Sequence, residues 1–162
     1  MWIKIVLKMF EDRIEKAVAL FKSGYNCSQS VVAAFADLYG IDEVTALRMS
    51  ASFGGGIGRM RQTCGAACGM FLLAGLETGS VDAGDREAKA HNYAVVQQLA
   101  AEFKQENGSL ICGELLGLAP KAETPPTPEA RTAEYYKKRP CSKMVETAAT
   151  IFARFLESKI EK

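Results

Sequence analysis

Apolar side chains recur at intervals of three and four residues along most of this 162-residue chain. In the first such segment, Phe10, Ile14, Ala17 and Phe21 share one helical face, and Gly24 ends the pattern. The next predicted helix covers about residues 27–39 and closes at Gly40. It begins with a variant of the capping box, in which Asn26 caps the helix and Gln29 reaches back. Its expected inward residues are Cys27, Val31, Ala34, Phe35 and Leu38.

Four further segments carry the same spacing. Asp42 is expected to cap a helix through about Ser52, with Val44, Leu47 and Ala51 inward, and Thr63 is expected to cap a helix over 64–77. The longest predicted helix, about 82–106, has an apolar stripe of Ala88, His91, Val95, Leu99 and Phe103. The last one follows Pro140 and turns inward Met144, Ala148, Ile151, Phe152, Phe155 and Leu156.

The connecting segments carry weaker patterns. Residues 110–117 are apolar and flanked by glycine, so we expect a single turn or a short helix. Residues 119–129 are rich in proline and predict a loop, and residues 132–139 are polar and predict a solvated segment. No alternating strand pattern occurs in the sequence. The prediction is an all-α, compact bundle of about six helices in one domain, residues 9–162, after an N-terminal extension of residues 1–8.

Composition limits the functional classes. Hydrophobic residues make up 48% of the chain, which suits a globular core, and 20 basic against 19 acidic residues give a net charge of +1. This balance indicates no nucleic-acid surface, and no apolar run reaches the roughly 20 residues of a membrane span. The short N-terminal apolar stretch, interrupted by Lys4 and Lys8, lacks a cleavage site for export. We therefore expect a cytoplasmic protein whose five cysteines serve redox or metal chemistry.

The segment 53–70, FGGGIGRMRQTCGAACGM, is the most distinctive in the chain. It contains neither the GxGxxG nor the GKS and GKT patterns of nucleotide-binding loops. We expect its glycines to let the backbone pass close to a cysteine site and to expose N–H groups toward a thiolate or a cluster sulfur. The expected contacts to a cofactor at this site are Gly55, Gly56, Arg59 and Gly65.

Three of the five cysteines fall at predicted helix starts. Cys27 follows Asn26, Cys64 follows Thr63 and Cys141 follows Pro140, while Cys112 begins a short segment of its own. The N-terminal N–H groups and dipole of a helix stabilise a thiolate, so lowered cysteine pKa values are expected, with Arg59, Arg61 and Arg139 adding to the effect. Cys68 lies one turn beyond Cys64. Its i, i+4 spacing is poor for a disulfide, and we expect a core residue or an occasional ligand.

These positions resemble the C_GCAxxG_C_C family, whose members are described as redox-active. The motif is Cys64-Gly65-Ala66-Ala67-Cys68-Gly69, the first family cysteine is Cys27, and the later two are Cys112 and Cys141. The similarity covers residues 14–155, and Cys68 occupies a variable motif position. Similar domains occur in a multihaem cytochrome with an added iron–sulfur site, so the resemblance also admits cluster binding. Covalent c-type haem is not expected, because the sequence lacks CxxCH.

Three functions remain open at this point. The first is a redox-active protein that works by thiol–disulfide or electron-transfer chemistry with a redox partner protein. In it, Cys64 attacks as a thiolate, and Cys27, Cys112 or Cys141 resolves the resulting mixed disulfide. In the second, the same four cysteines (Cys27, Cys64, Cys112, Cys141) supply ligands to a metal ion or an iron–sulfur cluster, and Cys68 is an accessory metal ligand. In the third, the chain is a non-catalytic helical interaction module. Small residues in the predicted helix 64–77 would also suit a homodimer contact.

Overall fold

The computed structural model describes the backbone of residues 2–162 and the side chains of residues 10–162. It contains the helices α1 (Trp2–Lys22), α2 (Cys27–Phe35), α3 (Glu43–Ser50), α4 (Gly65–Thr78), α5 (Arg86–Asn107), α6 (Cys112–Leu115), α7 (Ala133–Lys138) and α8 (Cys141–Ile160). Two 3₁₀ turns, η1 (Ala36–Tyr39) and η2 (Ala51–Phe53), follow α2 and α3. Over the described residues there are no strands, and six of the helices have seven or more residues. The prediction of an all-α bundle of about six helices is confirmed.

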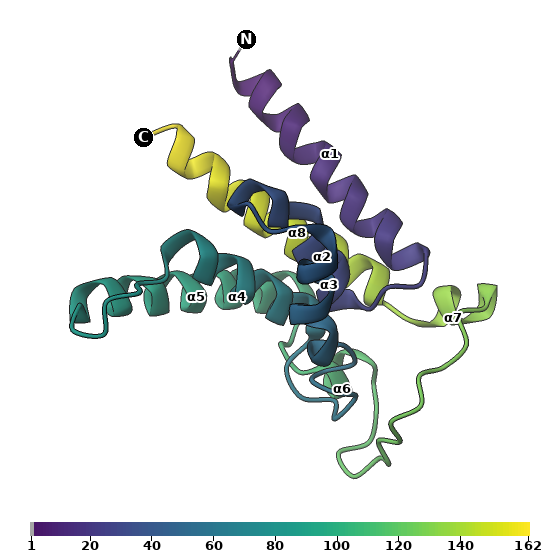
Figure 1. The fold of residues 1–162 in the computed structure, drawn as a ribbon. Coiled ribbons are helices and arrows are strands. Elements are labelled where there is room, and N and C mark those ends of the chain that lie inside the picture. Colours follow the sequence, from purple (N-terminus) through teal and green to yellow (C-terminus); the bar gives the residue numbers. More distant parts are fainter. Residues whose placement is uncertain (1) are drawn as a thin grey trace.

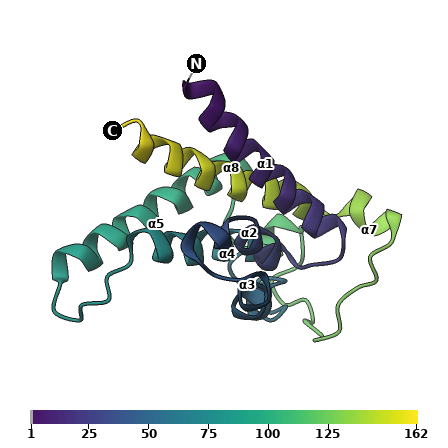
Figure 2. The ribbon, with the colours of Figure 1, turned by 45° about the horizontal axis from the view of Figure 1, so that its top comes forward.

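The helices pack around one principal core. α1 lies along α8, α2 lies between α1 and α4, and α4 also contacts α5 and α8 (Figure 1). At the centre, the rings of Phe35 and Phe152 meet edge to face with centroids 5.1 Å apart, and Met70, Leu99 and Phe103 are fully buried around them. The start of α1 and the end of α8 lie at the same end of the bundle. α5 projects away on one side, and the loop leading into α7 lies on the opposite side (Figure 2).

The capping residues behave largely as predicted. The Asn26 side chain accepts a hydrogen bond from the Gln29 backbone N–H at 2.9 Å, and the Gln29 side chain accepts one from the Asn26 N–H at 3.1 Å. Asp42 caps α3 through the Thr45 N–H at 3.0 Å. Thr63 is not the cap of α4, because Thr63 pairs with Ile111 in an isolated β-bridge and Cys64 occupies the N-cap position.

Several predicted inward residues face solvent instead. Leu38 is 42% exposed, because the chain tightens from α-helix to 3₁₀ turn after Phe35 and rotates the following side chains away from the core. On α3, Val44 is 60% exposed and Ala51 lies beyond the helix, while Ala46 and Ser50 are buried. Because α3 is short, it makes only a narrow contact with α2, and the spacing of its apolar residues is compatible with more than one buried face.

The long helix was predicted to start too early. Residues 82–85 form a turn, and Asp85 caps the helix through the Ala88 N–H at 2.9 Å. His91 is exposed rather than on the buried stripe, which contains Val95, Leu99 and Phe103. The first turns of α5 extend past the bundle, so their apolar positions have little to pack against (Figure 1).

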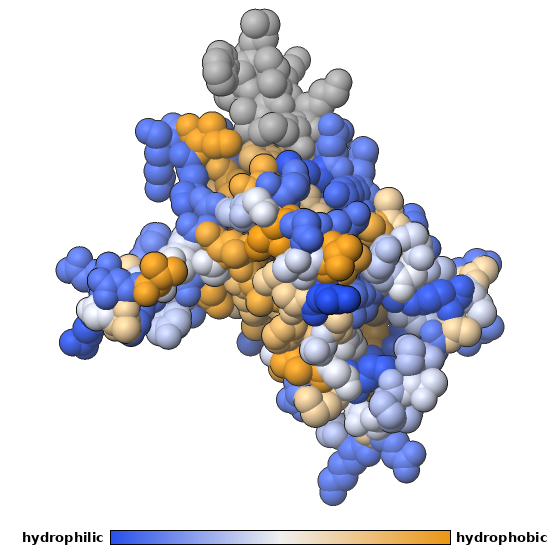
Figure 3. All heavy atoms as spheres, viewed as in Figure 1, coloured by the Kyte–Doolittle hydropathy of each residue, from blue (hydrophilic) through white to orange (hydrophobic). Residues whose placement is uncertain are grey.

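Two terminal and surface features complete the fold. The backbone is helical from Trp2, where α1 begins, but the side chains before Phe10 are outside the described residues. The assignment of residues 1–8 as an extension therefore stays a prediction. Of the described helices, none is long and apolar enough to cross a bilayer. On the face shown in Figure 3, many apolar residues gather toward the middle, and the projecting parts are mostly hydrophilic.

Candidate functional site

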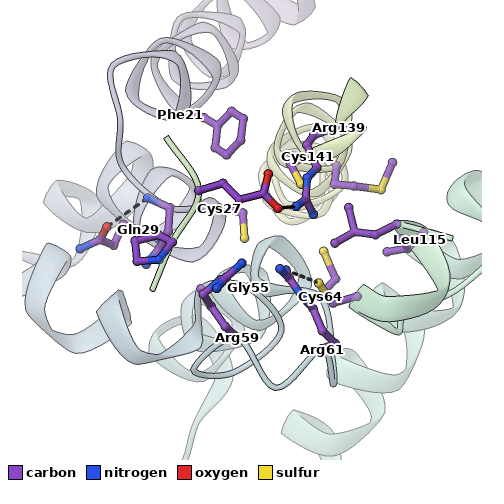
Figure 4. A pocket seen from close by; sticks show the side chains of 18 of the residues that line it. Phe21, Cys27, Gln29, Gly55, Arg59, Arg61, Cys64, Leu115, Arg139 and Cys141 are labelled. Atoms are coloured by element: carbon purple, nitrogen blue, oxygen red, sulfur yellow. Dashed lines mark hydrogen bonds and ion pairs between the residues drawn. The ribbon is translucent and has the colours of Figure 1, made fainter. Parts of the chain in front are cut away.

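One cavity of about 610 Å³ gathers the four cysteines named by the motif. Cys27 is the first residue of α2, Cys64 the N-cap of α4, Cys112 the first residue of α6 and Cys141 the first residue of α8. Figure 4 shows the side chains of Cys27, Cys64 and Cys141 reaching the cavity from separate elements. Four helix starts that are far apart in sequence thus converge on one space.

Cys68 does not line this cavity. Its thiol lies one turn further along α4 and donates a hydrogen bond to the Thr63 carbonyl oxygen, with 3.7 Å between sulfur and oxygen. Cys68 therefore lies outside the cavity wall, although it is close to Cys27: burial and, to a smaller extent, the charge of Cys27 raise the pKa of Cys68. Its accessory role stays a prediction.

Backbone pairing between two loops brings Cys64 and Cys112 together. The Cys64 N–H donates to the Leu110 carbonyl at 2.7 Å, and the Cys112 N–H donates to the Gln62 carbonyl at 2.6 Å. The two hydrogen bonds flank the isolated bridge between Thr63 and Ile111. This short antiparallel contact fixes the starts of α4 and α6 relative to each other.

Two glycines provide the close approach that the sequence predicted. A Cβ atom on Gly65 would lie 2.5 Å from the Cys27 Sγ atom and 2.7 Å from the Phe53 carbonyl oxygen. A Cβ atom on Gly56 would lie 2.5 Å from the Cys112 Cβ atom. Both distances are too short for any larger residue without a shift of the neighbouring segment. The glycine loop therefore gives clearance beside Cys112 rather than beside Cys64 as predicted, and Gly65 gives clearance beside Cys27.

The loop between η2 and α4 contains a left-handed turn. Gly55, Gly56, Ile57, Gly58 and Arg59 all have positive φ angles, between 58° and 74°. Glycine adopts this conformation without penalty, whereas each non-glycine residue there costs about 1–2 kcal/mol. The strain at Ile57 and Arg59 is therefore held in place by surrounding contacts, a pattern that is common at functional sites.

Arg59 and Arg61 project from this loop into the cavity (Figure 4). Arg61, also at positive φ (60°), donates from Nη1 to the Cys112 sulfur at 3.7 Å. Arg59 donates to the backbone carbonyls of Pro125 and Thr127 in the proline-rich loop. Through Arg59, the glycine loop holds the proline-rich loop against the cavity.

The proline-rich loop forms part of the cavity wall, a role that the sequence did not predict. Pro126, Pro128 and Glu129 line the cavity, and Glu129 forms an ion pair with Arg139. The segment after it forms the short helix α7, which Thr132 caps, and most of its residues are exposed, as predicted. No spacing in the sequence indicates that this loop returns to segments about 70 and 100 residues earlier.

Arg131 is a further cavity residue that the sequence did not indicate. Its guanidinium donates to the Phe21 carbonyl at 2.9 Å and to the Tyr25 carbonyl at 3.0 Å. It also stacks on the rings of Phe21 and Tyr135, 4.4 Å and 4.9 Å from their centroids. The only local signal was an arginine a few residues before two tyrosines, which alone does not predict a stacked guanidinium.

Burial overrides the expected lowering of the cysteine pKa values. Desolvation raises the pKa of Cys27 and raises that of Cys64 strongly, although the Gly55 N–H lowers the first and the Ala67 and Ala66 N–H groups lower the second. Burial, together with the charges of Cys27 and Cys112, raises the pKa of Cys141 to about 12, against the opposing effect of Arg139 and Arg131. The prediction of preformed thiolates at the helix starts is therefore wrong for these three residues.

The described cysteines carry no bond to one another. All five are free thiols, and in the part of the chain with described side chains no three His, Cys, Asp or Glu residues are grouped closely enough to hold a metal ion. The assignment of Cys27, Cys64, Cys68, Cys112 and Cys141 as metal ligands, and the contacts of Gly55, Gly56, Arg59 and Gly65 to a cofactor, stay predictions. The expected redox partner protein and the homodimer also stay predictions.

Comparison with known proteins agrees with the arrangement of the cysteines. No curated protein and no solved structure matches the chain. The family described as "Putative redox-active protein (C_GCAxxG_C_C)" matches residues 25–155, a range that includes all four cysteines of the cavity. Because this match covers most of the 162 residues, the chain belongs to the C_GCAxxG_C_C family.

Proposed function

We propose that the cavity is a thiol redox site that exchanges electrons with a disulfide. The observation that carries this proposal is the convergence of the four motif cysteines, and not Cys68, on one cavity. Cysteines that serve only as core residues have no reason to share a cavity wall. The family description as redox-active supports the same class of chemistry.

Exposure selects the thiol that reacts first. Cys141 is half-buried, whereas Cys27, Cys64 and Cys112 are buried at 8%, 5% and 7% exposure. Cys27 lines the same cavity as Cys141, each is the first residue of its helix, and the two helices α2 and α8 pack against each other. We therefore assign Cys141 as the attacking thiol and Cys27 as the resolving thiol, in place of the attack by Cys64 that the sequence suggested.

The exchange balances in two steps. Cys141 loses its proton and attacks a disulfide substrate, which forms a mixed disulfide and releases one substrate thiolate that takes up a proton. Cys27 then loses its proton and attacks the Cys141 sulfur, which releases the second substrate thiol. The protein dithiol is oxidised to a disulfide by two electrons, and the substrate disulfide is reduced to two thiols.

The test is a thiol count after exposure of the reduced protein to a neutral disulfide, 2-hydroxyethyl disulfide, without oxygen. We expect the loss of two free thiols and a Cys27–Cys141 peptide in the mass map. The Cys141→Ser variant should lose this reaction, while the matched control Cys68→Ser should keep it. Five unchanged thiols in the unmodified protein would overturn the proposal.

A metal ion or an iron–sulfur cluster is the second candidate, because the same four cysteines face a cavity with a surplus of positive charge that suits an anionic cluster. Purification without oxygen, followed by an absorption spectrum and metal analysis, tests it. Visible absorption with stoichiometric iron, lost in the Cys27→Ser variant but kept in Cys68→Ser, would support a cluster. A colourless, metal-free protein would count against it.

A further inference from the structure

The charged residues of the cavity are strongly unbalanced. Four arginines and one carboxylate line it, namely Arg59, Arg61, Arg131, Arg139 and Glu129. All four arginine residues are half-buried, so bulk water screens them only in part. With neutral thiols the lining carries an excess of three positive charges.

Three of these guanidinium groups are held by neutral partners. Arg131 donates to two backbone carbonyls and stacks on aromatic rings, Arg59 donates to two backbone carbonyls, and Arg61 donates to the Cys112 sulfur. Considering only side chains from Phe10 onward, Arg139 alone among the four forms an ion pair, with Glu129. The hydrogen bonds fix the positions of the groups without neutralising their charge.

Unpaired charge at partly desolvated positions is costly, and a bound anion would offset that cost. Arginine also presents a planar set of donors that matches a carboxylate with two parallel hydrogen bonds. We propose that the cavity selects an anionic ligand and that its substrate class is small disulfides bearing carboxylates. The substrate half of this proposal rests on the proposed thiol redox function, whereas the anion preference does not.

The geometry places the charges beside the sulfurs. The Arg61 Nη1 atom lies 3.7 Å from the Cys112 Sγ atom, and Arg139 precedes Cys141 by two residues in the chain. A carboxylate held by these groups would bring a disulfide a few bonds away toward the thiols. The cavity volume, about 610 Å³, is in the range of sites that bind small molecules.

Three disulfides of different charge test the substrate class. The reduced protein is mixed with oxidised glutathione (anionic), 2-hydroxyethyl disulfide (neutral) or cystamine (cationic). Each rate of thiol loss is divided by the rate of the same disulfide with 2-mercaptoethanol, which removes differences in intrinsic reactivity. We expect the order anionic, neutral, cationic, with about tenfold or more between the extremes, and a smaller spread at high salt.

Variants of one arginine identify the source of the selectivity. Arg61→Gln should lower about tenfold the ratio of the normalised rate with oxidised glutathione to the normalised rate with 2-hydroxyethyl disulfide, as expected for the loss of one charge-assisted contact to the anionic substrate. Arg61→Lys should restore part of this ratio, because it keeps the charge without the planar donors. The matched control is Arg48→Gln, on the exposed face of α3 outside the cavity.

Binding without reaction separates this inference from the proposed function. S-methylglutathione carries the same carboxylates and no disulfide, and we expect calorimetry to detect its binding and Arg61→Gln to weaken it. If it binds but no disulfide oxidises the thiols, the anion preference stands and the redox function fails. If it does not bind and the three disulfides react at equal normalised rates, the inference is overturned and the redox function stands.

Discussion

The substitution Gly65→Ala examines the contact on which the cavity geometry depends. Gly65 is the first residue of α4, and a Cβ atom there would meet the Cys27 Sγ atom at 2.5 Å and the Phe53 carbonyl oxygen at 2.7 Å. The sulfur is close to its own backbone and the carbonyl belongs to the η2 turn, so neither group can swing away freely. Either the start of α2 or the η2 turn has to move.

The size of the effect follows from two opposing terms. Alanine is favoured over glycine in a helix by about 0.5–1 kcal/mol, whereas overpacking a well-packed site costs about 1–3 kcal/mol. The difference is a loss of up to about 2.5 kcal/mol in the free energy of unfolding of Gly65→Ala. For a chain of this size that corresponds to a Tm lower by up to about 10 °C.

Gly75→Ala on the same helix is the matched control. Gly75 is exposed, and a Cβ atom there would meet nothing within 4 Å, so only the helix preference remains and stability should rise by about 0.5–1 kcal/mol. Urea unfolding of the reduced proteins, followed by far-UV circular dichroism, measures both variants. If Gly65→Ala is stabilised as much as Gly75→Ala, the close approach of α4 to Cys27 is wrong.

Three further predictions concern protons, a cap and the proline-rich loop. Burial raises the pKa of Cys68 to about 11 and contributes to raising that of Cys141 to about 12, so the folded protein keeps protons that the unfolded chain releases above pH 9. The stability that these protonated thiols contribute is complete below pH 9 and is lost as the pH rises toward 11–12, by about 1.4 kcal/mol per thiol at pH 10. Urea unfolding at pH 8 and 10 measures this loss, and Cys68→Ser should remove the part of it that comes from Cys68. Asn26→Ala should lower the free energy of unfolding by about 1 kcal/mol in the same assay, because it removes the capping box, and an unchanged value would contradict that role. Arg59→Gln should speed limited proteolysis within residues 119–129 several-fold through loss of its carbonyl contacts, and an unchanged cleavage rate would show that other contacts hold the loop.

The sequence predicted local features well where one residue determines the geometry. The capping box at Asn26 and the helix starts at Cys27 and Cys141 are recognisable from the chain alone and are present in the fold. The cavity itself was harder to predict from the sequence, because it depends on how four helix starts are placed relative to one another. Hydrogen bonds between the segments around Cys64 and Cys112 join parts of the chain almost 50 residues apart, and no periodic pattern encodes them.

Some failures were failures of magnitude rather than of principle. The helix-start N–H groups do lower the pKa of Cys64, as the dipole argument requires, but its desolvation is the larger effect. The burial of a residue depends on which distant segments pack over it, and a local sequence motif does not predict those contacts. Val44 and His91 were predicted to face the core but are exposed, for the same reason. The spacing of apolar residues indicates which side of a helix is apolar, but it does not show whether another element covers that side.

The competition between burial and positive charge has a consequence for the chemistry of the cavity. A thiolate, not a thiol, attacks a disulfide, so protonated cysteines are protected from non-specific oxidation at neutral pH. Arg139 and Arg131 act in the opposite direction on Cys141, but burial outweighs them. Because burial is the largest contribution to this balance, we expect thiol reactivity to rise when water or an anionic ligand enters the cavity. In this arrangement the arginines fix where an anion binds, while burial determines how rarely the thiols react without one.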